Sequence, residues 1–177
     1  MTDMGDVPLV LGVGVTHHRE KGTVTITQGK YTKFLLERCG MASYNSAYTP
    51  GVGKELSLDQ PEERLLNKEE TPRFQAITDS VMYFVQVTRY NILCAVNQLA
   101  RAMSKPSTAH IAAAKHLLRY LAGTLNFAIT YNQGDLKLMA AFSAVDWGNK
   151  PSNGKSMSSS VVFLPNGPAS STWGFKG

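Results

Sequence analysis

The spacing of apolar residues changes once in the second half of this chain, and the change separates helix from strand. Between Phe74 and Leu121 apolar side chains recur every three or four residues, which is typical of helices that bury one face. After Gly123 they recur at every second residue, which is typical of strands. We therefore expect an α+β fold in which helices and strands occupy separate stretches.

The first part of the chain shows the two patterns in the reverse order. Alternation over 9–28, around a turn at 19–22, predicts a β-hairpin. Helical spacing over 31–39, followed by Gly40 as a left-handed cap, predicts a helix. A segment rich in proline, glycine and mixed charges follows, which predicts a surface connection with one short helix near Pro61.

Capping residues divide the middle of the chain into three helices. Thr71 and a following proline begin the first, a Lys-Pro pair ends the second, and Ser107 or Thr108 caps the third. Strands are then expected at 127–131, 136–146 and 156–164, with turns at 132–134 and 149–154. The predicted domains are 1–45 (hairpin and helix), 46–71 (connection), 72–124 (helical region) and 125–177 (sheet).

The charge balance is compatible with an acidic partner such as nucleic acid. The 177 residues carry a formal net charge of +5, but lysine and arginine are scattered and form no long basic block. Lys115 and Arg119, four residues apart on one helix, make a basic edge that can follow a phosphate backbone; an ordinary solvated helix face is the alternative. The candidate nucleic-acid-binding residues are Arg89, Arg101, Lys105, Lys115 and Arg119.

No catalytic or metal-binding residue is assigned from the sequence. The Gly-Lys-Ser string that ends at Ser156 has Asn149 where a phosphate loop needs glycine, and β-like residues follow it, so a hairpin turn at 153–154 is the better interpretation. Cys39 and Cys94 lie in helical stretches and are expected to be small buried side chains. Without a leader or an apolar membrane span, the chain is expected to be soluble and intracellular, in the cytoplasm or the nucleus.

Five strings, in order along the chain, carry a resemblance to one family. They are "TDMGDVPLVLGVGV", "ITQGKYTKFLLERCGM", "YTPGVG", "FQAITDSVMYFVQVTRYNILCAVNQLARAMSKPSTAHIAAAKHLLRYLAGT" and "FSAVDWGNKPSNGKSMSSSVVFL". Together they resemble the Pol polyprotein of copia-class LTR retrotransposons, from the end of the reverse transcriptase into the start of the ribonuclease H domain. The resemblance implies that 125–177 are the first strands of an incomplete ribonuclease-H-like mixed sheet.

The resemblance also implies what this stretch lacks. Family members copy RNA into DNA and degrade the RNA strand with Mg²⁺ held by carboxylates. The polymerase Tyr-x-Asp-Asp motif would precede Met1, the later ribonuclease H acids would follow Gly177, and Ala144 occupies the position of the first metal-binding aspartate, beside Asp146. We therefore expect no cofactor in this chain, although Mg²⁺ is expected for the intact family enzyme.

The sequence is compatible with two functions. The first is a fragment of a reverse transcriptase and ribonuclease H polyprotein that is inactive alone, with the rest of the polyprotein as its partner. The second is a retained nucleic-acid-binding or protein-interaction module, with weak binding to RNA:DNA hybrid or another nucleic acid and no membrane partner.

Overall fold

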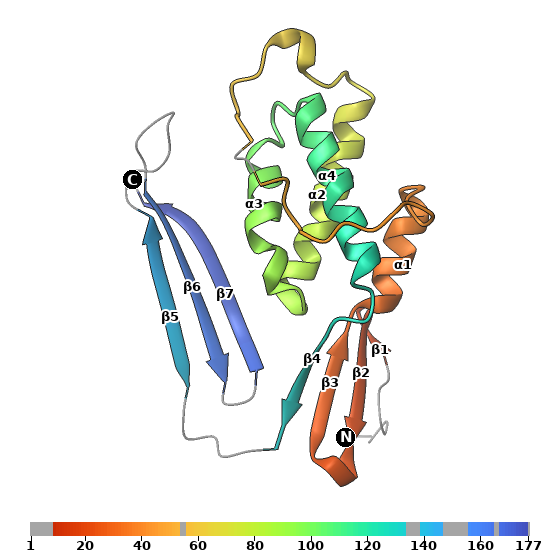
Figure 1. The fold of residues 1–177 in the computed structure, drawn as a ribbon, viewed down its shortest axis with the longest axis vertical. Helices are drawn as coiled ribbons and strands as arrows, with labels where there is room; N and C mark the ends of the chain where they lie inside the picture. Colours follow the sequence, from red (N-terminus) through yellow and green to blue (C-terminus); the bar gives the residue numbers. More distant parts are fainter. Residues whose placement is uncertain (1–8, 54–55, 134–138, 147–155, 165–166, 177) are drawn as a thin grey trace, which may run out of the picture. The chain divides into compact units, whose positions relative to one another are not determined.

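The computed structural model of the protein describes residues 9–53, 56–133, 139–146, 156–164 and 167–176 (Figure 1). The chain folds into two compact units. One contains Gly14–Thr27 and the strands from Ala128 onward, and the other contains Gln28–Phe127, where the helices lie. The α+β class is confirmed, and among the described residues no helix is long and apolar enough to cross a membrane.

The predicted hairpin is confirmed in the first sheet. Strands β2 (Val13–His18) and β3 (Thr23–Thr27) pair antiparallel, joined by a 3-10 turn at Arg19–Lys21. Gly22 ends that turn with φ of 59°, a left-handed conformation that glycine adopts without strain. The sheet order is β1-β2-β3-β4, with β1 at Leu9–Val10.

The expectation that strand 127–131 begins the C-terminal sheet is wrong. This strand, β4 (Ala128–Asn132), pairs antiparallel with β3 in the first sheet. The register places Ile129 opposite Ile26 and Tyr131 opposite Val24, so apolar residues share one face. On the other face the hydroxyls of Thr25 and Thr130 lie 3.0 Å apart. Matched faces on both sides of the sheet favour this long-range pairing.

The C-terminal strands form a second sheet, in the order β5-β6-β7. Strands β5 (Ala140–Asp146) and β6 (Ser156–Leu164) were predicted, whereas β7 (Gly167–Lys176) was not. Both pairings are antiparallel, so the described strands do not show the parallel pairing of the expected mixed sheet. The turn predicted at 149–154 lies outside the described residues, as does Gly134 of the turn predicted at 132–134.

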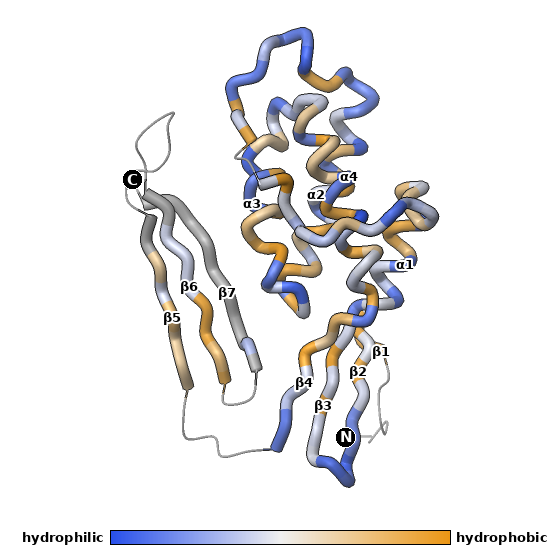
Figure 2. Tube along the Cα trace, viewed as in Figure 1, coloured by the Kyte–Doolittle hydropathy of each residue, from blue (hydrophilic) through white to orange (hydrophobic). Residues whose placement is uncertain are grey.

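The helical unit has the predicted helices. These are α1 (Gly29–Arg38), α2 (Glu70–Val87), α3 (Leu93–Arg101, after a 3-10 turn at Tyr90–Ile92) and α4 (Thr108–Gly123). Their apolar faces enclose a core that includes fully buried Phe74, Phe84, Leu99 and Leu117. In contrast to this core, the connection that carries the 3-10 helix Glu62–Arg64 is mostly hydrophilic (Figure 2).

Ser107 precedes α4 and is its N-cap residue, as expected. Its backbone N–H donates to Nδ1 of His110 at 3.1 Å, and its hydroxyl lies 2.7 Å from the same nitrogen. Both residues are fully buried, so these bonds satisfy polar groups at the helix start. Both cysteines are free thiols, and only their burial differs from expectation: Cys39 is half-buried, and Cys94 is exposed.

Candidate nucleic-acid interface

Helix α4 presents two of the predicted cations on one side. Lys115 is exposed and Arg119 is half-buried one turn later. Residues four apart on a helix are neighbours, because 3.6 residues complete one turn. The sequence spacing therefore brings these two side chains onto the same face, with His116 between them in sequence.

A short extended segment, Asn45 to Thr49, lies against this face of α4, and we call it the strap. Nε of Arg119 donates to the Asn45 carbonyl at 2.6 Å, and Nε2 of His116 donates to the Thr49 carbonyl at 2.9 Å. The Ala47 N–H donates to the Arg119 carbonyl at 3.3 Å. Three hydrogen bonds thus fix the strap along one helical turn.

The strap approaches the end of α4 closely at Gly123. A Cβ atom added to Gly123 would lie 2.8 Å from the Cβ atom of Ser46, which is closer than two carbon atoms can pack. Glycine at position 123 therefore avoids a clash with the strap, in addition to ending the helix.

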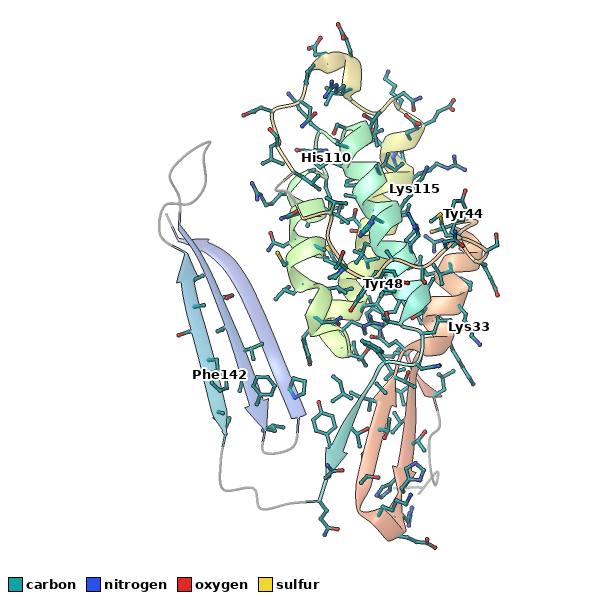
Figure 3. The ribbon with its side chains drawn as sticks, in the orientation of Figure 1. Lys33, Tyr44, Tyr48, His110, Lys115 and Phe142 are labelled. Atoms are coloured by element: carbon teal, nitrogen blue, oxygen red, sulfur yellow. The ribbon has the colours of Figure 1, made fainter. Side chains whose placement is uncertain are left out.

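Beside the strap lies an open groove of about 730 Å³. Three cations, Arg64, Lys115 and Arg119, line it, and its apolar surface includes three alanines of α4 at positions 109, 112 and 113. Tyr44 also lines the groove and is 57% exposed. No carboxylate occurs among the lining residues in the part of the chain that the structure describes. Figure 3 labels Lys115 on α4 and Tyr44 on the segment after α1.

A second hollow, of about 540 Å³, shares Val52 and His116 with the first. Gln98 of α3 and Thr49 of the strap also line it. Because two lining residues are common to both, the hollows adjoin. They offer a continuous path along the surface of the helical unit.

Arg89, also predicted to bind nucleic acid, lies in the interior and is only 3% exposed. Its guanidinium donates to the carbonyl and the hydroxyl of Thr124 at 3.0 and 2.6 Å and lies over the rings of Tyr120 and Phe127. Burial lowers the pKa of Arg89, and Tyr120 opposes that shift. A cation at the carboxyl end of α4 is favoured by the helix dipole, so a structural role accounts for it.

The other two predicted cations lie away from the groove lining. Arg101 is half-buried as the last residue of α3, and Lys105 is exposed in the loop before α4. Conversely, sequence reasoning missed Arg64 and Tyr44 at the groove. Tyr44 lies in an irregular segment and Arg64 in a three-residue 3-10 helix, and neither carries a periodic pattern that indicates which residues approach α4.

The residues of β5 do not fit the Mg²⁺ expected for the intact family enzyme. The Ala144 side chain has no atom that can bind a metal, and its register partner on β6 is Ser159. Asp146 pairs in register with Met157, so the neighbouring strand brings no second carboxylate opposite it. Among the described residues, no group of three or more His, Cys, Asp or Glu side chains could hold a metal ion.

Comparison with known proteins gives several relatives. The chain is 31% identical to "Retrovirus-related Pol polyprotein from transposon RE1" of Arabidopsis thaliana over 89% of its own length, and 29% identical to the corresponding protein from transposon TNT 1-94 of Nicotiana tabacum over 96%. An uncharacterized mitochondrial protein of Arabidopsis thaliana is 27% identical over 93% of the chain.

The coverage of these relatives is uneven. The chain spans 10% of the RE1 polyprotein and 13% of the TNT 1-94 polyprotein, but 65% of the mitochondrial protein. No protein-family model and no solved structure matches the chain.

Proposed function

Because this chain is related to the Pol polyproteins of copia-type retrotransposons, we propose that it is a non-catalytic part of the reverse transcriptase and ribonuclease H region that contacts nucleic acid through α4. In this proposal the polymerase and ribonuclease H carboxylates belong to other parts of the polyprotein, which is the partner of this segment. The segment binds nucleic acid and separates the catalytic parts of the polyprotein, and it catalyses no reaction itself.

One observation carries the nucleic-acid part of the proposal. Lys115 and Arg119 lie on one face of α4, in a groove that also receives Arg64 and has no carboxylate among its described lining residues. Neutralising phosphates with lysine and arginine releases counterions, which drives sequence-independent binding. With few cations in one place, binding is expected to be weak and sensitive to salt.

The non-catalytic part of the proposal is supported by β5. A two-metal site needs several converging carboxylates to offset the charge of two cations. At the position of the family's first metal-binding aspartate this chain has Ala144, which faces Ser159 across the sheet. A nuclease mechanism therefore lacks a ligand at the strand where the family supplies one.

The experiment is binding of the full chain to a fluorescein-labelled RNA:DNA hybrid at low salt, followed by fluorescence anisotropy. We expect Lys115→Gln combined with Arg119→Gln to weaken binding about tenfold, since each surface ion pair contributes up to about 1 kcal/mol. The matched control, Lys30→Gln with Lys33→Gln, removes the same charge from exposed positions on α1 and is expected to bind like the parent.

A further control separates charge from structure. Arg119→Lys keeps the positive charge but loses the Nε–H that bonds the Asn45 carbonyl, so hybrid binding should persist. Equal losses in the α4 and α1 double variants would mean that only net charge matters, and the proposed interface would be rejected.

A further inference from the structure

We propose that the groove beside the strap binds single-stranded nucleic acid, with a base stacked on Tyr44 and the backbone passing Lys115 and Arg119. This inference rests on the proposed function, because it names which form of nucleic acid the α4 face takes. It differs from contact with an RNA:DNA duplex in requiring an unpaired base.

The charge of the groove suits a phosphate backbone. Arg64, Lys115 and Arg119 line it without a carboxylate among its described lining residues, and Lys115 is exposed. Single strands are bound in grooves of this sign, whose cations follow the backbone. The strap sets the position of one of these cations, since it accepts a hydrogen bond from Nε of Arg119.

The aromatic side chain supplies a surface for a base. Tyr44 lines the groove, is 57% exposed, and contacts no other aromatic ring among the described residues. Proteins that bind single strands combine a basic groove with rings of this kind, and each base has a face that can stack on them. The three alanines of α4 that line the same groove give the base an apolar surface.

The geometry favours a single strand over a duplex. In a duplex the base faces are stacked on one another and the edges are paired, so Tyr44 could not reach a base face. The two adjoining hollows, which share Val52 and His116, form a continuous path along the surface of the helical unit. In the second hollow the Gln98 amide can bond a base edge.

The test measures affinity of the full chain for three fluorescein-labelled probes of equal length: oligouridylate, oligodeoxythymidylate and an RNA:DNA hybrid. At least one single strand should bind more tightly than the hybrid. Tyr44→Ala should weaken single-strand binding about tenfold without changing the salt slope, and Tyr44→Phe should bind like the parent, because it keeps the ring. Lys115→Gln should lower the slope by about 0.7.

Tyr48→Ala is the matched control, because Tyr48 is 98% exposed on the strap but does not line the groove. It should leave single-strand affinity unchanged, whereas equal losses for Tyr44→Ala and Tyr48→Ala would overturn the inference. Hybrid binding that depends on Lys115, without single-strand binding, would also overturn it while leaving the proposed function standing. Absence of binding to all three probes would reject both.

Discussion

Replacing Arg89 with methionine tests whether this cation acts in the interior or on nucleic acid. Methionine keeps an unbranched side chain but removes the donors to the Thr124 carbonyl and hydroxyl at 3.0 and 2.6 Å. A hydrogen bond from a charged donor contributes roughly 1.5–3 kcal/mol, and each cation–ring contact adds about 0.5–1 kcal/mol. Because the cost of burying the charge is also removed, we expect a net loss of roughly 3 kcal/mol.

Urea unfolding followed by circular dichroism measures this loss as a change in the free energy of unfolding. The control is Lys105→Met, which makes the same substitution type at an exposed cation and should change that free energy by less than about 0.5 kcal/mol. In thermal unfolding, a loss of roughly 3 kcal/mol corresponds to a Tm lower by about 6–12 °C.

The reasoning fails on a specific combination of results. If Arg89→Met unfolds at the same urea concentration as the parent, and its binding to RNA:DNA hybrid has a salt slope lower by about 0.9, then Arg89 contacts a phosphate. Its assignment to the end of α4 would then be refuted.

Three further predictions concern other sites. Gly123→Ala should lower the free energy of unfolding by about 1–3 kcal/mol because its Cβ meets that of Ser46 at 2.8 Å, and adding Ser46→Gly should restore most of it; additive losses in urea would contradict the clash. Ala144→Asp should produce no cleavage of labelled RNA:DNA hybrid with Mg²⁺; cleavage abolished by Asp146→Asn would show a more complete site. Burial lowers the pKa of His110, so the unfolded chain binds more protons and stability should fall as pH drops below about 6.5, by up to about 1.4 kcal/mol per pH unit. His110→Gln should remove that component, and an unchanged pH profile in urea would count against it.

Local sequence patterns were sufficient to predict the elements whose formation depends on neighbouring residues. The β2–β3 hairpin and the helices followed from apolar spacing and from caps such as Ser107 and Gly40. Strand β7 was missed because Gly-Pro-Ala-Ser-Ser-Thr has few of the β-branched or aromatic residues that mark a strand.

Interactions between distant segments could not be predicted in the same way. The pairing of β4 with β3 joins residues about a hundred positions apart, and either neighbour would satisfy the alternation of β4. Arg89 looked like its exposed counterparts, because the Thr124 groups that receive it lie 35 positions away. The basic edge was predicted from a four-residue spacing, whereas the groove around it depends on the strap and Arg64.

The most direct test of the central claim is the salt dependence of binding to RNA:DNA hybrid. The logarithm of the association constant is measured against the logarithm of salt concentration for the full chain and for Lys115→Gln with Arg119→Gln. If α4 neutralises two phosphates, the slope of the variant is smaller in magnitude by about 1.8 on a duplex probe, and Lys30→Gln with Lys33→Gln keeps the parent slope. A parent slope near zero, or an equal slope in all three proteins, would contradict the claim that this segment contacts nucleic acid through α4.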